Sequence, residues 1–178
     1  MYSSSFEQIL QLHSKIFHSL NTNDIDYLVT TLLSHKNTGR IIGLGAGRMG
    51  YSLRSFIMRL SHIGFEAYMI GDTTLPRVGH GDLVLVNSSS GNTPSILLYT
   101  EQAKQAGATI ISLSANNESK IASLADRTIC YTVEEDFQLM KTSYEQFSFL
   151  FWDFVAQKII VSGNLNVEKI EYNHSILE

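Results

Sequence analysis

Cysteine and long hydrophobic runs are the two clearest shortages in this sequence. A single cysteine, Cys130, rules out an intramolecular disulfide and any multi-cysteine metal site. It lies in a strand-like run from Arg127 to Thr132, so a packed core thiol is favoured over a nucleophile. No stretch approaches the roughly 18 apolar residues that a membrane helix needs, and the N-terminus lacks the pattern of a signal peptide. We therefore expect a cytoplasmic protein.

Positive charge is also scarce. The 178 residues include 13 lysines and arginines against 17 acidic residues, a formal net charge of −4. Such a chain lacks the broad positive field that binds nucleic acid backbones, so no nucleic-acid partner is expected. A small phosphate ester needs no such field, because backbone N–H groups and hydroxyls at a helix N-terminus can bind it. The histidines show no ligand spacing with acidic clusters, which predicts no bound metal.

What the sequence does contain is a regular alternation of helical and strand patterns. Apolar residues at helical spacing predict two helices within residues 4–33, and short apolar runs predict five strands, at 40–44, 66–70, 82–86, 108–113 and 127–131. Helices are predicted between strands at about 45–62, 95–106 and 120–124, and a long C-terminal helix at 142–161. This alternation predicts an α/β fold in which an open, doubly wound, five-stranded parallel sheet is flanked by helices. We expect one domain over residues 1–178.

A glycine-rich turn follows the first predicted strand. Residues 45–50, Gly-Ala-Gly-Arg-Met-Gly, match the G-x-G-x-x-G pattern of dinucleotide-binding turns. Asp72, after the second predicted strand, is placed to meet the ribose of such a ligand. The motif alone is weak, because the same glycines also suit another phosphate or a tight turn without a ligand.

A second turn, rich in hydroxyls, follows the third predicted strand. Residues 87–93, Asn-Ser-Ser-Ser-Gly-Asn-Thr, stand just before a helix that begins near Pro94. These hydroxyls can bind one anion at the positive end of the helix dipole, or they can simply cap the helix. Ligands of open parallel sheets bind beyond the carboxyl ends of the strands, where both turns lie. We therefore predict a phosphate-binding site at these two turns, built from Gly47, Arg48, Ser88, Ser89, Ser90 and Thr93.

Here the chain resembles the SIS (sugar isomerase) domain family, whose phosphate loop S-x-S-G-x-T is matched by residues 88–93. Further segments are similar to the 6-phospho-3-hexuloisomerase branch, at residues 45–48, 58–65, 71–76, 81–83, 144–146 and 174–178. The resemblance implies interconversion of 3-hexulose 6-phosphate and fructose 6-phosphate, no metal or cofactor, and a homotetramer. Met49, Ser89 and Asn92 differ from the serine, glycine and glutamate that are usual in the branch, which implies altered contacts with the sugar.

The resemblance also supplies candidate catalytic groups. Moving a carbonyl between neighbouring carbons needs a base that removes a proton, giving an enediol, and then returns it. Glu145 matches the family's base, although a glutamate in a helix's first turn can simply balance the helix dipole. His62 matches a candidate acid, with a helix-end cap as the alternative. Arg48 is expected to hold a substrate hydroxyl or an enediolate oxygen, unless it is a solvated surface arginine.

Subunit contacts are suggested by the predicted helix at 142–161, which carries more aromatic surface than one sheet face normally covers. Part of it is expected to meet another subunit, and His174, near the C-terminus, is placed to reach a neighbour's pocket. The leading hypothesis is thus a sugar-phosphate isomerase. A non-catalytic SIS module that senses a sugar phosphate is the first alternative, and a dinucleotide-dependent oxidoreductase is the second.

Overall fold

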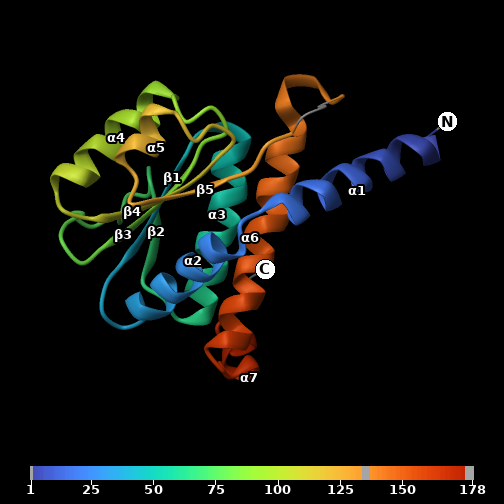
Figure 1. Cartoon of the computed structure of the whole chain (residues 1–178). Helices are drawn as coiled ribbons and strands as arrows, with labels where there is room; N and C mark the ends of the chain where they lie inside the picture. The colour runs from blue at the N-terminus through green and yellow to red at the C-terminus, as the bar shows by residue number, and fades with distance from the viewer. Residues whose placement is uncertain (1, 134–136, 175–178) are drawn as a thin grey trace.

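The computed structural model of this chain describes residues 2–133 and 137–174 (Figure 1). Five strands form one sheet: β1 (Ile41–Gly45), β2 (Ala67–Met69), β3 (Leu83–Asn87), β4 (Thr109–Ser114) and β5 (Arg127–Cys130). The helices are α1 (Tyr2–Ser19), α2 (Thr22–His35), α3 (Gly47–Ile63), α4 (Pro94–Gln105), α5 (Lys120–Leu124), the 3-10 helix η1 (Leu139–Lys141), α6 (Thr142–Ser162) and α7 (Val167–Tyr172). The predicted elements are confirmed to within two residues, whereas η1 and α7 were not predicted. None of the helices in these two ranges has the length and hydropathy to span a bilayer.

Local sequence signals set several helix ends. Asn21 caps α2, because its side chain accepts a hydrogen bond from the N–H of Asn23 at 3.0 Å. α3 stops at Gly64, whose φ of 94° lies in the left-handed region. α4 begins at Pro94, which suits a first helical turn because its nitrogen carries no hydrogen to donate.

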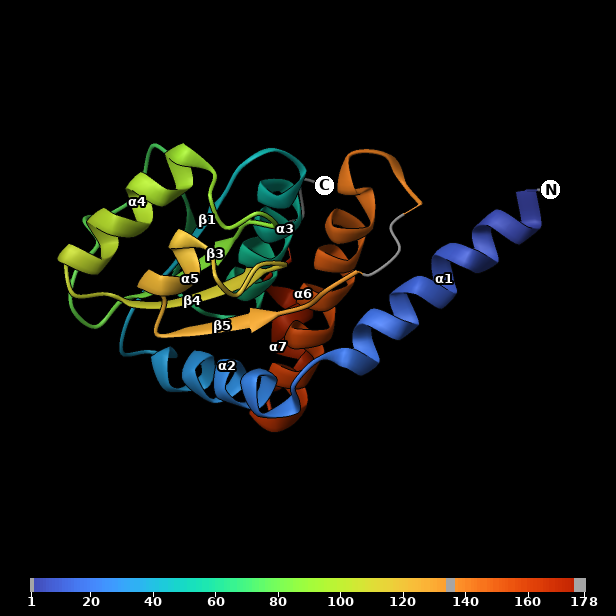
Figure 2. The same ribbon diagram turned by 45° about the horizontal axis from the view of Figure 1, so that its top comes forward.

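All neighbouring strands of the sheet are parallel, in the order β2-β1-β3-β4-β5, and helices cover both faces (Figure 2). Leu83 and Leu85 of β3 pack into a core with α2, α3 and α6, whereas Val84 and Val86 of the same strand pack into a second core with α4 and α5. Successive side chains of a strand point to opposite faces, so a strand buried on both faces must be apolar throughout. This explains the continuous apolar runs and confirms the doubly wound sheet.

The chain reverses its direction across the sheet between β1 and β3. From β1 it moves outward through α3 to β2, and from β3 it moves the other way through α4 and α5 to β5. The carboxyl ends of these two strands are neighbours, with Gly45 in register with Asn87. Open α/β sheets bind their ligands in the crevice at such a reversal. We call this place the switch-point crevice.

The long helix α6 buries most of its aromatic side chains within the chain. Trp152 stacks on Phe56 of α3 with 4.9 Å between ring centroids, and Phe147 and Phe151 are fully buried. Phe154 packs edge-on against Phe17 of α1, also at 4.9 Å. The aromatic surplus that predicted a subunit contact is therefore largely covered by α1 and α3. α1 itself projects away from the body of the chain (Figures 1 and 2).

Cys130 is only half-buried, because β5 is an edge strand. The expectation of a packed core thiol is thus met only in part. Burial still raises the pKa of the thiol, although a hydrogen bond from the backbone of Asn117 opposes the shift. A raised pKa keeps the thiol protonated at neutral pH, which argues against a nucleophile.

Candidate functional site

The first turn of α3 lies directly against the end of β1. A Cβ atom added to Gly50 would lie 2.6 Å from the carbonyl oxygen of Gly45, so no larger residue fits there. Gly47 has a φ of 54°, a backbone conformation that glycine adopts without strain. Ala46, the N-cap residue just before α3, makes no side-chain capping hydrogen bond. The glycines thus bring the start of α3, with Arg48 in its first turn, to the switch-point crevice.

The hydroxyl-rich turn forms the other wall of the crevice, at the start of α4. Thr93 is the N-cap residue of α4, yet its side chain makes no capping hydrogen bond. Its Oγ1 instead lies 3.3 Å from the Oγ of buried Ser88, the first hydroxyl of the turn. The hydroxyl of Ser90 is exposed and accepts a hydrogen bond from the N–H of Asn92 at 3.2 Å. The capping alternative does not account for Thr93, whose hydroxyl is available to an anion at the positive end of α4.

Two of the positions that differ from the usual branch pattern brace this turn. The carbonyl of Ser89, which is half-buried, accepts a hydrogen bond from the N–H of Ala115 at 3.0 Å. The side chain of Asn92 accepts from the N–H of Lys120 at 3.2 Å and donates to the carbonyl of Ser90 at 3.1 Å. The side chain of Asn92 therefore ties the turn to the start of α5.

Gly91 fixes the shape of the same turn. Its φ of 64° is in the left-handed region, and a Cβ atom there would overlap the side chain of Ser119. The carbonyl of Gly91 also accepts a hydrogen bond from the N–H of Ile121 at 3.0 Å. The turn is thus held in one conformation before any ligand arrives, which lowers the entropic cost of binding.

Arg48 and Glu145 lie side by side at the crevice, although 96 residues lie between them in the sequence. The Nε of Arg48 lies 3.0 Å from the Oε2 of Glu145, which stands in the first turn of α6. The arginine side chain is 61% exposed and the carboxylate 21%. An exposed pair of this kind contributes about 0–1 kcal/mol, so a bound ligand can replace it at little cost.

A buried asparagine that the sequence analysis did not single out joins these parts. Asn87 ends β3 and is fully buried. Its Nδ2 lies 2.8 Å from the carbonyl of Met49, 2.9 Å from the Oγ of Ser52 and 2.7 Å from the Oγ of Ser148. The available signal was a polar residue that closes an otherwise apolar strand. The hydroxyls that it contacts are far away in the sequence, and nothing in a sequence pattern reveals them.

His62 lies away from the other candidate residues. It stands in the last turn of α3, and the 14 residues from position 48 to position 62 span about 21 Å of helix. Its ring is buried, and its centroid lies 5.0 Å from that of His174. The structure thus brings Gly47, Arg48, Glu145 and the turn at 88–93 together, but not His62. The rest of the similar C-terminal segment, residues 175–178, lies outside the described residues.

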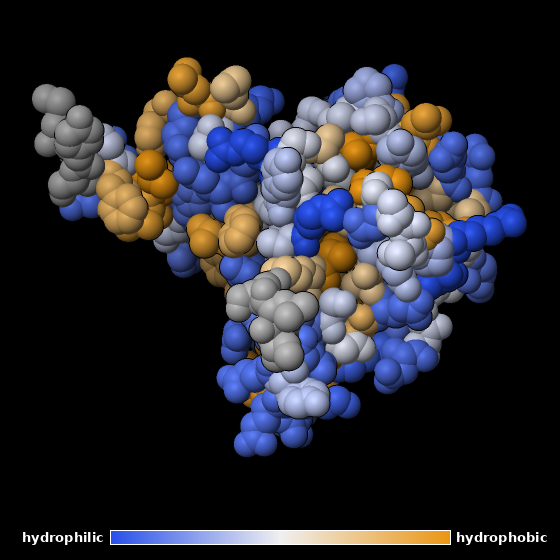
Figure 3. All heavy atoms as spheres, turned by 180° about the vertical axis from the view of Figure 1, so that it is seen from behind, coloured by the Kyte–Doolittle hydropathy of each residue, from blue (hydrophilic) through white to orange (hydrophobic). Residues whose placement is uncertain are grey.

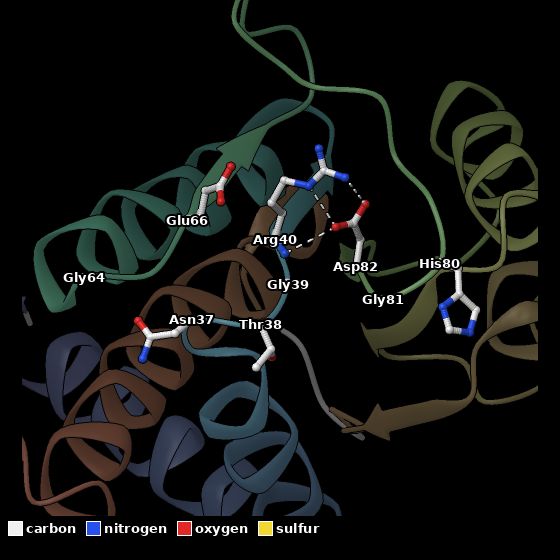
Figure 4. A pocket seen from close by; sticks show the side chains of 9 residues that line it. All are labelled: Asn37, Thr38, Gly39, Arg40, Gly64, Glu66, His80, Gly81 and Asp82. Atoms are coloured by element: carbon white, nitrogen blue, oxygen red, sulfur yellow. Dashed lines mark hydrogen bonds and ion pairs between the residues drawn. The ribbon is translucent and has the colours of Figure 1, made fainter.

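A polar cavity of about 510 Å³ opens at the opposite side of the sheet, where the strands begin (Figure 4). We call this side the amino edge, and the side where the strands end the carboxyl edge. Its arginine, Arg40, is already committed to Asp82: Nε lies 2.9 Å from Oδ1 and Nη2 lies 3.0 Å from Oδ2. Asp82 is buried and also accepts a hydrogen bond from the N–H of Gly79 at 2.8 Å. This cavity is therefore a weaker candidate for an anionic ligand than the switch-point crevice.

The side chains that a metal or a dinucleotide would need can be checked in the same way. Within residues 2–133 and 137–174, no group of three or more histidine, cysteine or acidic residues is placed to hold a metal. Asp72, the acid that a dinucleotide would need, binds Arg54 at 2.7 Å and the N–H of Met69 at 2.9 Å. Burial alone would raise the pKa of Asp72, but these two hydrogen bonds outweigh it and lower the pKa.

Comparisons with known proteins show what this chain is similar to. A family model described as the SIS domain matches residues 32–153. A 3-hexulose-6-phosphate isomerase of Bacillus subtilis is 32% identical over 97% of this chain and 96% of its own length. A hypothetical protein of Methanococcus jannaschii, whose crystal structure infers a function of 3-hexulose-6-phosphate isomerase, is 31% identical with a TM-score of 0.84, covering 97% of this chain and 96% of its own. The Vibrio vulnificus NanR protein, complexed with ManNAc-6P, shares the fold at 20% identity, with a TM-score of 0.81 over 96% of this chain and 66% of its own.

Proposed function

The chain belongs to the SIS domain family, and we propose that it is a sugar-phosphate isomerase that interconverts 3-hexulose 6-phosphate and fructose 6-phosphate. The observation that carries the proposal is the meeting of Arg48 and Glu145 beside the hydroxyl-rich turn, at the crevice between β1 and β3. A cation, a carboxylate and an anion-binding turn are the three parts that this reaction needs from a protein.

The phosphate group is bound by the turn at residues 88–93. Ser88, Ser90 and Thr93 donate hydrogen bonds from their hydroxyls, and backbone N–H groups at the start of α4 complete the site. The half-buried Ser89 lies between them. Because this anchor needs no lysine, it suits a chain of net charge −4. The bound phosphate then holds the sugar carbons over the switch-point crevice.

Proton transfer is assigned to Glu145. Its carboxylate removes the proton from C3 of fructose 6-phosphate, so that an enediol forms between C2 and C3. It then returns the proton to C2 while the hydroxyl proton of O3 passes to O2, and the carbonyl is left at C3. Arg48 gives up its contact with Glu145 when a substrate oxygen arrives, and it stabilises the negative charge that develops on that oxygen.

The candidate acid His62 belongs to this site only if a second copy of the chain supplies it, because about 21 Å of helix separate it from Arg48 in the same copy. Such an arrangement requires at least two copies, and we propose the homotetramer that the resemblance to the hexuloisomerase branch implies. Apolar side chains are exposed on α1 and on the N-terminal half of α6, among them Phe6, Leu10, Phe149 and Leu150. Apolar atoms gather on this side of the molecule (Figure 3). Apolar surface of this kind marks contacts between proteins.

A sensor of sugar phosphates is the second candidate function. It is favoured by Met49, whose side chain is buried where the hexuloisomerase branch usually has a serine, so this position offers no hydroxyl to a sugar. A sensor would keep the phosphate-binding turn and bind the same ligands. It would not exchange their carbon-bound protons.

Fructose 6-phosphate in heavy water separates the two functions. An isomerase that works through an enediol replaces the hydrogen on C3 with deuterium, which NMR detects directly. Thermal unfolding of the same protein reports binding, because a ligand at 100 times its Kd stabilises the fold by about 2.7 kcal/mol. Stabilisation with neither deuterium uptake nor product would establish the sensor and refute the isomerase.

A further inference from the structure

Three buried polar side chains form a hydrogen-bonded cluster directly behind the candidate site. They are Ser52 of α3, Asn87 of β3 and Ser148 of α6, and we call them the buried triangle. The two serine hydroxyls are 2.7 Å apart, and the amide nitrogen of Asn87 lies within 2.9 Å of both. Ser52 is 3% exposed, and the other two are fully buried.

The orientation of the Asn87 amide is fixed by its surroundings. The carbonyl oxygen of Met49 lies 2.8 Å from Nδ2, and a carbonyl can only accept a hydrogen bond. Turning the amide over would bring two oxygen atoms together at that position. Asn87 therefore acts as a donor to both helices, whereas its Oδ1 has no partner among the described residues.

Each member of the buried triangle stands next to one working part of the site. Ser88, the first hydroxyl of the phosphate-binding turn, directly follows Asn87 in the sequence. Arg48 precedes Ser52 by four residues on α3, and Glu145 precedes Ser148 by three residues on α6. Residues three or four apart lie on the same side of a helix, one turn from each other. The triangle thus ties together the three elements that carry the anchor, the cation and the base.

We propose that Ser52, Asn87 and Ser148 are positioning residues, which set where Glu145 stands relative to the phosphate-binding turn. This inference rests on the proposed isomerase function. A substrate that is anchored by its phosphate presents its C3 hydrogen at a fixed place, so the carboxylate must be held at the matching distance. The cross-link between β3 and α6 supplies that constraint from inside the protein, without touching the substrate.

The variant Ser148→Ala tests the proposal, because it removes one hydroxyl and keeps a residue that favours helix. We expect kcat with fructose 6-phosphate to fall by about tenfold to a hundredfold, the range that a displacement of about 1 Å can cause. KM should stay within about twofold, because the phosphate anchor is unchanged.

Ser112→Ala is the matched control. The Oγ of Ser112 pairs with the Oγ1 of Thr128 at the same distance of 2.7 Å, and Ser112 is 1% exposed, but this pair links β4 to β5. Both variants should lose a similar amount of thermal stability. Only Ser148→Ala should lose kcat, since a purely structural role would affect the two alike.

The background Glu145→Gln shows whether the triangle acts through the base. In that background Ser148→Ala should cause no further loss of kcat, because the group that it positions is already inactive. A further loss equal to the one in the wild-type protein would mean that the triangle acts on something else, and it would overturn the proposal.

Hydrogen exchange with inorganic phosphate supplies a measurement that needs no turnover. In the wild-type protein and in Ser112→Ala, phosphate should slow amide exchange both at residues 88–97 and in the first turns of α6. In Ser148→Ala only residues 88–97 should be protected, and protection of both segments there refutes the inference.

If the wild-type protein isomerises no sugar phosphate, the proposed function is wrong and this exchange result still decides the positioning role. If it does isomerise and Ser148→Ala keeps its kcat, the inference is wrong and the proposed function stands.

Discussion

The sheet has an amino edge, where its strands begin, and a carboxyl edge, where they end. Each carries an arginine paired with a carboxylate, but the pairs are built differently. At the amino edge, Arg40 binds the buried Asp82 through two hydrogen bonds. At the carboxyl edge, the Nε of the largely exposed Arg48 lies 3.0 Å from the Oε2 of Glu145. Removing one partner of a buried pair leaves an uncompensated charge, whereas an exposed pair contributes little. The first pair belongs to the fold, and the second is available to a ligand.

The same contrast holds for the groups around each pair. Asp82 is also bound by the backbone N–H groups of Arg40 and Gly79, so its acceptor capacity is used within the protein. At the carboxyl edge, Thr93 caps no helix with its side chain, although it occupies the N-cap position. The polar side chains that neither pair with a buried charge nor cap a helix are therefore concentrated at the switch-point crevice.

The largest effect is expected for Glu145→Gln. The amide keeps the shape of the carboxylate but cannot accept a proton from carbon, so isomerisation should slow by about two to four orders of magnitude. Stability should change by no more than about 1 kcal/mol, because the contact with Arg48 is exposed. Initial rates and thermal unfolding measure the two quantities on the same sample. Near-normal turnover would show that Glu145 is not the base.

The arginine pairs themselves can be compared by one substitution made at each edge. Arg40→Met leaves the carboxylate of Asp82 buried without its cation, which should cost about 3 kcal/mol of unfolding free energy. Arg48→Met should cost less than about 1 kcal/mol.

The activities of the two variants should run in the opposite order. Arg48→Met should lose about 10² to 10³ in kcat, the usual effect of removing a group that stabilises an oxyanion. Arg40→Met, once folded, should turn over normally. Denaturant unfolding and steady-state kinetics are the measurements, and equal stability losses in the two variants would contradict the distinction between the edges.

Thr93→Ala sharpens the contrast between a hydroxyl that binds a ligand and one that caps a helix. Each hydrogen bond to a charged group is worth about 1.5–3 kcal/mol, so affinity for fructose 6-phosphate should fall by roughly tenfold to a hundredfold. The unliganded fold should lose little, because Thr93 makes no capping bond. Asn21→Ala is the control: it removes a real cap, on α2, and should cost about 1 kcal/mol without weakening the ligand. Calorimetric titration would reveal an unchanged affinity of Thr93→Ala, and that result would exclude its hydroxyl from the site.

The sequence was most informative where local chemistry determines structure. The apolar runs of β3 and β4 follow from burial on both faces, and the turns at 45–50 and 88–93 carry the glycines and hydroxyls that their backbones and ligands require. The short helix α7 was missed because its six residues, Val167–Tyr172, carry no apolar periodicity. The aromatic surplus of α6 is partly covered within the chain, because a projecting helix, α1, packs against Phe154, and periodicity alone does not show that contact.

The candidate site was predictable in its parts but not in its arrangement. Glu145 and Arg48 came from motifs, yet their meeting depends on α6 lying beside α3 with both helices starting at the same edge of the sheet. Contacts between distant segments leave no periodic signal, so the link from Asn87 to Ser52 and Ser148 could not be foreseen. The distance between His62 and Arg48, by contrast, was predictable, because both residues lie on one helix and its length sets their separation.

The smallest effect concerns the pair formed by Asp72 and Arg54, which lies on the exposed side of this contrast because its aspartate is 31% exposed and its arginine 49%. The hydrogen bonds of Asp72 lower its pKa in the folded protein, against the effect of burial. A carboxyl group stabilises the folded state when its pKa is lower in the folded protein than in the unfolded chain. This stabilisation is complete above the unfolded pKa of about 3.9, and it is lost as the pH falls through the folded pKa. Asp72→Asn should therefore lower stability at pH 7 by less than about 1 kcal/mol, and the difference from the wild-type protein should shrink as the pH falls below about 3.9. Thermal unfolding at several pH values measures this difference, and one that grows as the pH falls would show that the carboxylate is not held by Arg54.

Thermal shifts with NAD test whether Asp72 binds a dinucleotide. Because Asp72 is bound to Arg54, NAD should stabilise neither the wild-type protein nor the variant. Stabilisation that depends on Asp72 would restore the dinucleotide hypothesis.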